Sequence, residues 1–283
     1  MKTHIGEWLT RKLILNPIFV VGIGRSGTSA LLQAISAHPQ VVPAQGEAPL
    51  LQFFGTTVDR LEFSEEREYY FKTLFLPKEQ LYHDLRRMCF ETVAGPNYGW
   101  SRIVHGPRRR DLPVRHLTHW CAKVGVKIDG YRGLRQLYPG ARFVYIVRNG
   151  IDVIHSRTRF LGFRHLSFES HCRTWAESVE AFGYLAEAEN AIQVRHEQLV
   201  ADPEGQLRQV FDLAGLPPHP GPVQLVRGTL IIPLDQPTRS GVDVRQVFEE
   251  RQPPYETWTE EQRETFRGSA GDAMRKLGYE VPF

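Results

Sequence analysis

Short apolar runs recur along the chain, and each is followed by a segment whose apolar residues have helical spacing. The runs lie at residues 18–23, 124–128, 143–147 and 191–194. Such runs are typical of strands buried on both faces of a sheet. Because strands that alternate with helices form parallel sheets, the pattern predicts an α/β protein with a central parallel sheet between two helical layers. Ligands of such folds bind beyond the carboxyl ends of the strands.

Two long helices are predicted from the same periodicity. Across Phe168–Ala186, apolar residues recur three and four positions apart and include Trp175, which we therefore expect in the core. Near the end of the chain, Thr259 and Gln262 have the spacing of a capping box. This spacing predicts a helix that begins there and ends near Gly278.

Two segments interrupt the alternation within what we expect to be a single domain of residues 1–283. Residues 48–118 contain no clear parallel strand and are rich in aromatic residues, which predicts a helical insertion. Its aromatic side chains either shape an acceptor pocket or form an ordinary core. Residues 217–254 hold 8 of the 19 prolines, so we expect an irregular crossing segment that acts as a lid.

Composition narrows the range of partners. The formal net charge is only +3, which does not suggest nucleic-acid binding. Of the 35 basic residues 28 are arginine, which suits forked recognition of phosphate or sulfate oxygens or simply reflects a GC-rich coding sequence. No segment reaches the roughly 20 apolar residues of a membrane span.

The three cysteines, Cys89, Cys121 and Cys172, have no paired spacing. The sequence therefore predicts neither a disulfide framework nor a zinc site, and no other metal site is indicated. A reducing compartment fits this cysteine usage best, so we expect a cytoplasmic protein.

The segment GIGRSGTS at residues 22–29 joins the first predicted strand to a predicted helix. Gly22 and Gly27 have the spacing of a Walker phosphate loop, but Thr28 stands where that loop carries its lysine. The backbone amides of such a loop bind an anion. Because an NTPase needs the lysine to bridge the β- and γ-phosphates, we expect a P-loop-type fold that does not hydrolyse ATP.

A second anion signal follows the strand at 143–147. Arg148 ends this strand, and the helix that follows bears Ser156. A guanidinium and a hydroxyl beside a helix N-terminus suit a phosphate group, although an arginine at this place is also commonly a surface ion pair. Two anion sites on neighbouring strands, without a Walker lysine, indicate a donor with two separated phosphates whose transferred group is not phosphate.

Five phrases, in this order and spacing, resemble one family: VGIGRSGTSALLQAISAHP, QGEAPLL, WCAKVG, LYPGARFVYIVRNGIDVIHS and VRHEQLVADP. They resemble the sulfotransferases that use 3′-phosphoadenosine 5′-phosphosulfate (PAPS), and among these most the tyrosylprotein sulfotransferase branch. The resemblance covers roughly residues 18–216 and, more loosely, the C-terminal part. It implies in-line attack of an acceptor hydroxyl on sulfur, release of adenosine 3′,5′-bisphosphate (PAP), and no metal requirement.

The resemblance also implies which residues hold the donor. Arg25 matches the position whose basic side chain faces the bridging group, within a loop that holds the 5′-phosphosulfate: Gly24, Arg25, Ser26, Gly27, Thr28 and Ser29. Arg148 and Ser156 match the pair that binds the 3′-phosphate. Arg239 and Ser240 look like the late element that closes on the same phosphate, and His196 stands where several relatives carry tyrosine.

Catalytic roles come from the same resemblance. Glu47 matches the base of the tyrosylprotein branch, and Lys123 matches its catalytic lysine. Lys123 and Lys127 both flank the predicted strand at 124–128, but only Lys123 has the family's spacing to LYPGARF. Three histidines remain alternatives for the base: His105, His116 and His119.

The acceptor is the least defined part of the prediction. A small-molecule or lipid hydroxyl is expected, and a peptide tyrosine is a further option, whereas the oligomeric state is not predicted. Two other functions stay open: a P-loop kinase for a small molecule, and a nucleotide-binding relative without turnover. The joint presence of Arg25, Glu47 and Lys123 argues against the second of these.

Overall fold

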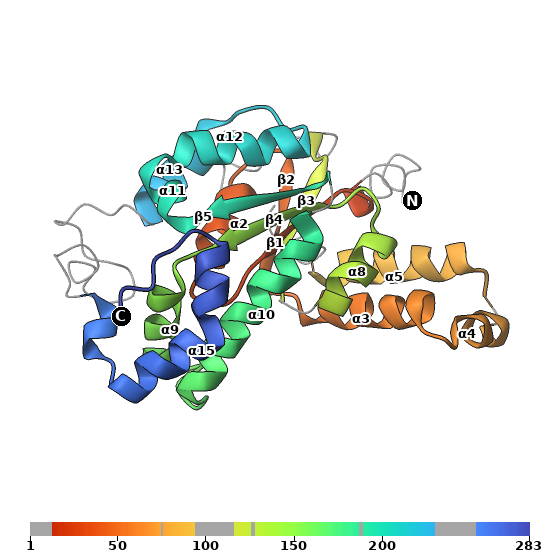
Figure 1. The fold of residues 1–283 in the computed structure, drawn as a ribbon. Helices are drawn as coiled ribbons and strands as arrows, with labels where there is room; N and C mark the ends of the chain where they lie inside the picture. The colour runs from red at the N-terminus through yellow and green to blue at the C-terminus, as the bar shows by residue number, and fades with distance from the viewer. Residues whose placement is uncertain (1–12, 75, 94–115, 126–127, 187–188, 230–252) are drawn as a thin grey trace.

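A computed structural model describes residues 13–74, 76–93, 116–125, 128–186, 189–229 and 253–283. At its centre lies a sheet of five parallel strands in the order β2-β3-β1-β4-β5. The strands are β1 (Pro17–Val21), β2 (Val41–Glu47), β3 (His119–Val124), β4 (Arg142–Val147) and β5 (Ala191–Arg195). The predicted parallel α/β fold is confirmed, because helices cover both faces of this sheet (Figure 1).

Two of the strands differ from the sequence prediction. The prediction of a strand at 124–128 is wrong, since β3 spans His119–Val124. Its buried residues include Trp120, Cys121 and Ala122, but a histidine and a lysine interrupt the apolar pattern. Lys123 therefore lies near the carboxyl end of its strand and not before its start. β2 was not predicted because its sequence, VVPAQGE, has an apolar run of only two residues.

One helical layer packs on the side of α2 (Thr28–Ser36). It also contains α12 (Pro203–Ala214) and α13 (Pro220–Thr229), with the short α11 (His196–Ala201) at the end of β5. The predicted apolar face of α2 is confirmed, since Leu31, Ala34 and Ile35 are fully buried. α13 is a regular helix within the proline-rich segment, whose residues 230–252 lie outside the described residues.

The opposite layer contains the two predicted long helices. α10 spans Phe168–Ala186 as predicted, and Trp175 is fully buried in it. α15 (Glu260–Lys276) begins with the predicted capping box of Thr259 and Gln262. Three further elements complete this side: α8 (Ile128–Leu137), α9 (Gly150–Arg159) and the 3-10 helix η2 (Pro254–Thr257).

The described part of segment 48–118 forms an arm of three helices that extends away from the sheet (Figure 1). These are α3 (Pro49–Phe63), α4 (Arg67–Thr73) and α5 (Lys78–Val93). Its aromatic residues divide between core and surface, because Phe54, Tyr82 and Phe90 are buried whereas Phe53 and Tyr69 are exposed. The start of α3 reaches the carboxyl edge of the sheet, where Pro49 and Gln52 lie near Lys123.

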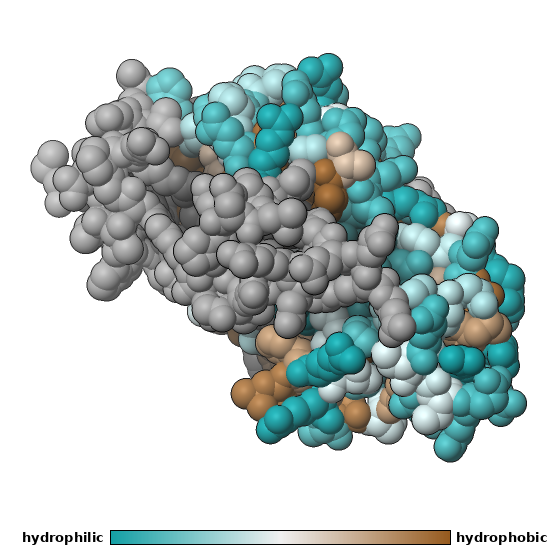
Figure 2. Space-filling view, turned by 90° about the vertical axis from the view of Figure 1, so that its left-hand side faces the viewer, coloured by the Kyte–Doolittle hydropathy of each residue, from teal (hydrophilic) through white to brown (hydrophobic). Residues whose placement is uncertain are grey.

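The face turned toward the viewer in Figure 2 is mainly hydrophilic where the described residues are visible, with hydrophobic residues in small separate patches. None of the helices in the described ranges is long and apolar enough to cross a lipid bilayer. The three cysteines are buried, and within the described ranges none of them forms a disulfide bond.

Candidate functional site

The glycine-rich loop between β1 and α2 is held in an unusual backbone conformation. Arg25 is a non-glycine residue with a φ of 81°, and Gly27 follows with a φ of 94°. A left-handed arginine costs of order 1 kcal/mol or more and is tolerated mainly where function requires it. At Gly27 a Cβ atom would lie 2.7 Å from Cδ2 of His196, so both backbone and packing require glycine. The loop is thus closely apposed to the start of α11.

Arg25 and Arg148 both lie beside α9: Arg148 precedes its first turn, and Arg25 contacts its second half. Nε of Arg25 donates a hydrogen bond of 3.1 Å to Oγ of Ser156. Desolvation lowers the pKa of Arg25, and the positive charge of Arg148 lowers it further. The two guanidinium groups repel each other, so an anion bound between them would stabilise the arrangement.

Two buried polar atoms, one in this cluster and one in the loop, lack a hydrogen bond within the described part of the chain. Nε of Arg148 is buried without a hydrogen bond, and its contact with Oδ2 of Asp152 is a longer ion pair of 3.7 Å. Oγ of Ser26, in the loop, is also buried and unpaired. Since buried polar groups are normally satisfied, each of these atoms indicates a polar ligand at its own position.

His196 closes the other side of the cluster. Burial, and then the charge of Arg148, lower the pKa of His196 to about 4, while Glu197 opposes this effect. The ring is therefore neutral near pH 7 and can donate one hydrogen bond and accept another. Thus five of the residues predicted to hold the donor come together: Arg25, Gly27, Arg148, Ser156 and His196.

The backbone around Arg148 is fixed by residues that the sequence did not single out. Oε1 of Glu197 accepts a hydrogen bond of 2.9 Å from the amide of Asn149, and Oε2 accepts one of 2.9 Å from the hydroxyl of Tyr279. Nε1 of Trp175 donates to the carbonyl of Arg148 at 3.3 Å. Glu197 was visible only as the neighbour of His196, and no local pattern pointed to Tyr279.

A cavity of about 300 Å³ opens on the other side of the loop, at the carboxyl ends of β1 and β3. The loop contributes Gly22, Ile23, Gly24 and Thr28, β3 contributes Lys123, and α3 contributes Gln52. Arg157 of α9, Phe163 of the connection after it and Thr174 of α10 close the cavity. Both polar atoms of the Gln52 side chain are buried without a hydrogen bond among the described residues, so this cavity is also built for a polar ligand.

Glu47 lies next to Lys123 across the sheet. The two residues are backbone partners in the parallel pairing of β2 with β3, and the amide of Ala48 donates to the carbonyl of Lys123 at 3.3 Å. The side chain of Glu47 lies outside what the structure describes. Its backbone nevertheless reaches the edge of the cavity where Lys123 and the loop meet.

The alternative histidines are less well placed. His119 is the first residue of β3, four residues before Lys123, so its backbone lies about 13 Å along the strand from Lys123. His116 is exposed and precedes the strand. His105, Lys127, Arg239 and Ser240 lie outside the described residues.

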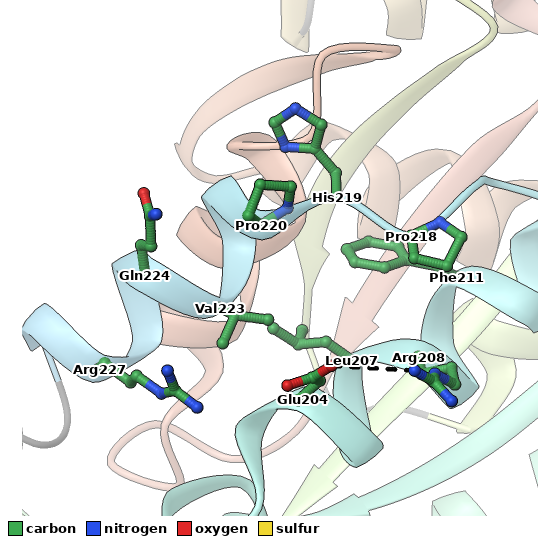
Figure 3. Close-up of a pocket in the computed structure, with 10 residues that line it drawn as sticks. All are labelled: Glu204, Leu207, Arg208, Phe211, Pro218, His219, Pro220, Val223, Gln224 and Arg227. Atoms are coloured by element: carbon green, nitrogen blue, oxygen red, sulfur yellow. Dashed lines mark ion pairs between the residues drawn. The ribbon is translucent and has the colours of Figure 1, made fainter.

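A second cavity, of about 350 Å³, lies between α12 and α13 (Figure 3). Leu207, Phe211 and Val223 form an apolar part, and Glu204 pairs with Arg208 at 3.8 Å. None of the residues predicted to hold the donor or to act in catalysis lines it. The candidate site is therefore the loop, with the arginine cluster on one side and the smaller cavity on the other.

The fold and this site define a protein of the sulfotransferase class, and comparison with known proteins agrees. A family model described as the sulfotransferase family matches residues 17–220, so the chain belongs to that family. The resemblance found in the sequence motifs is confirmed.

Curated relatives include protein-tyrosine sulfotransferases. The chain is 24% identical over 208 residues to "Protein-tyrosine sulfotransferase" of Drosophila melanogaster, which covers 71% of this chain and 38% of the relative. It is 22% identical over 249 residues to "Omega-hydroxy-beta-dihydromenaquinone-9 sulfotransferase" of Mycobacterium bovis. This match covers 75% of this chain and 62% of the relative. The chain spans 38%, 50% and 58% of the lengths of three tyrosine-sulfotransferase relatives.

Solved structures share the fold. A sulfotransferase domain from the olefin synthase of Synechococcus PCC 7002 has a TM-score of 0.52 at 18% identity, covering 94% of this chain and 96% of that one. Mouse sulfotransferase SULT7A1, solved in complex with PAP, has a TM-score of 0.50 at 14% identity, covering 96% and 90%. At these identities the likeness concerns the fold.

Proposed function

We propose that this protein transfers the sulfuryl group of PAPS to an acceptor hydroxyl and releases PAP. The observation that carries the proposal is the loop of Arg25, placed between a cluster of cationic and polar side chains and a cavity. The cluster of Arg148, Ser156 and His196 lies on one side of it, and the cavity with Lys123 lies on the other. A donor with two phosphate groups and a transferable group needs such a divided site.

The described residues fit the donor. The loop from Gly24 to Ser29 would hold the 5′-phosphosulfate through its backbone amides and the N-terminus of α2. Arg148, Ser156 and His196 would hold the 3′-phosphate, for which the buried, unpaired Nε of Arg148 is a ready donor. Arg239 and Ser240 are proposed for the same phosphate from the resemblance alone.

The cavity supplies what the transfer requires. The acceptor oxygen forms a bond to sulfur while the bond from sulfur to the 5′-phosphate oxygen breaks, and the hydroxyl proton moves to Glu47 as general base. General-base catalysis contributes about 10²- to 10⁴-fold. Lys123 and Arg25 stabilise negative charge on the sulfuryl and leaving oxygens. PAP leaves with the electron pair of the broken bond.

We propose a small-molecule or lipid hydroxyl as the acceptor, with a peptide tyrosine as the second option. Relatives of both kinds occur, since the names of two of them specify protein tyrosine and a hydroxylated menaquinone. The start of α3 lines the cavity, so the helical arm is the element proposed to shape the acceptor site. The cytoplasmic location stays a prediction from the cysteine usage.

Donor choice is tested by thermal unfolding of the purified chain with PAP, PAPS or ATP and Mg²⁺. We expect PAP and PAPS to raise the melting temperature in a saturable way, and ATP with Mg²⁺ to leave it unchanged. The opposite pattern would replace this proposal with the P-loop kinase. Protection by PAP without sulfuryl transfer to any hydroxyl would favour the relative without turnover.

A further inference from the structure

Arg157 is a buried cation to which the sequence motifs assign no role. It is 4% exposed and lines the cavity that also contains Lys123. Among the side chains that the structure describes, no carboxylate lies within ion-pair distance of its guanidinium. A buried charge is costly unless an opposite charge or a set of hydrogen bonds compensates it. A buried arginine beside a reaction cavity therefore indicates an anionic ligand.

The guanidinium is held in place by two rings, neither of which neutralises it. Nε of Arg157 donates a hydrogen bond of 3.2 Å to Nδ1 of His171, and its Cζ lies 4.2 Å from the ring centroid of Phe163. Burial, and then the charge of Arg157, lower the pKa of His171 to about 4, so His171 is neutral near pH 7. The described contacts orient the side chain and leave both terminal nitrogens available to a ligand.

Arg157 and its neighbour Ser156 serve different sides of the loop. Successive residues of a helix point about 100° apart, and Ser156 is bonded to Arg25 in the phosphate cluster. Arg157 instead faces Gly24, where a Cβ atom would lie 3.6 Å from its Nη1 and 2.9 Å from Cζ of Phe163. The terminal nitrogen is thus packed against the first residue of the loop proposed to hold the 5′-phosphosulfate.

We infer that Arg157 binds the sulfuryl group of PAPS during its transfer, as a second cation of the cavity beside Lys123. This inference rests on the proposed function and names a residue within its site. The guanidinium would donate to the sulfuryl oxygens, which stay on sulfur while the bridging S–O bond breaks and the acceptor S–O bond forms. His171 and Phe163 are positioning residues for this cation.

The test compares PAPS with PAP, because the two ligands differ by the sulfuryl group. Calorimetric titration in the absence of acceptor gives the Kd of each ligand for the wild type and for Arg157→Gln, Arg157→Met and Arg157→Lys. We expect the first two variants to weaken PAPS binding about tenfold or more, while PAP binding stays within about twofold. Arg157→Lys keeps the positive charge but loses the planar guanidinium group with its two terminal donors. Its Kd for PAPS should therefore lie between the values of these two variants and that of the wild type.

Arg159→Gln is the matched control, since it removes an exposed arginine from the same helix and should leave both Kd values unchanged. Circular dichroism and thermal unfolding show whether each variant is folded, and Arg157→Met keeps most of the packing against Phe163. An equal loss of PAP and PAPS binding would overturn the inference in favour of a structural role. Unchanged binding of both with a raised acceptor KM would assign Arg157 to the acceptor instead. If the wild type binds neither ligand, the proposed function itself fails.

Discussion

Oγ of Ser156 accepts a hydrogen bond of 3.1 Å from Nε of Arg25, although 131 residues separate them in the chain. The bond joins the loop after β1 to helix α9. Sequence motifs had assigned these two residues to different phosphate groups of one donor. In the structure they form one contact beside Arg148, so the two halves of the donor site are physically coupled.

Ser156→Ala should therefore weaken the binding of PAP about fivefold, because one hydrogen bond of about 1 kcal/mol is lost and the orientation of Arg25 is relaxed. The Kd is measured by calorimetry. Ser167→Ala, in the exposed connection before α10, is the control and should leave the Kd unchanged. Equal Kd values for Ser156→Ala and the wild type would remove Ser156 from the donor site.

Lys123→Ala should lower kcat about 10²- to 10³-fold, since a cation that stabilises charge in the transition state is lost. PAP binding should stay within about threefold, because Lys123 lies on the cavity side of the loop. Steady-state kinetics and PAP titration measure the two effects. Lys276→Ala, which removes an exposed lysine at the end of α15, should change neither. A loss of PAP affinity without a loss of kcat would contradict the role given to Lys123.

Glu47→Gln keeps the size of the side chain and removes the base. The rate with an unactivated alcohol should fall about 10²- to 10⁴-fold. His105→Ala, His116→Ala and His119→Ala should each retain the wild-type rate. If Glu47→Gln retains the rate and one histidine variant loses it, that histidine is the base.

The lowered pKa of His171 predicts that the folded protein loses stability in mild acid. Its pKa in the folded protein is about 4, against an ordinary value of 6.5, so between these values the unfolded chain binds more protons than the folded one. The free energy of unfolding should fall as the pH is lowered through this window, by up to roughly 3 kcal/mol from this fully buried residue. Urea unfolding at a series of pH values measures it.

His171→Asn should flatten that pH profile. The residual slope in His171→Asn belongs to other groups such as His196, whose pKa is also lowered to about 4 by burial and by Arg148. An unaltered slope in His171→Asn would show that His171 does not titrate in this window.

Much of the fold was predictable because three of its five strands are marked by short, mainly apolar runs. β1, β4 and β5 were found within two residues of their ends, and α10 at both ends. β2 and β3 were missed or displaced because Pro43, Gln45 and Lys123 break their apolar patterns. Strand β3 is nevertheless buried, since pairing with two neighbours compensates for a polar residue at its end.

The site was predictable where its residues belong to local phrases, such as the loop and the sequence from Arg148 to Ser156. Contacts that depend on distant segments were not predictable. Tyr279 reaches Glu197 across 82 residues, and Arg157 lies in the cavity because α9 and α10 pack around it. An arginine within a helix has no sequence signal that separates burial beside a cavity from exposure to solvent.

Sulfuryl transfer is tested most directly by incubating the chain with PAPS and either a metabolite extract or tyrosine peptides. Mass spectrometry identifies sulfated products, and chromatography measures PAP. We predict a sulfated product and PAP in equal amounts with the wild type, and neither above background with Lys123→Ala. Absence of both from the wild-type reactions, or equal formation by wild type and Lys123→Ala, would contradict the proposed transfer.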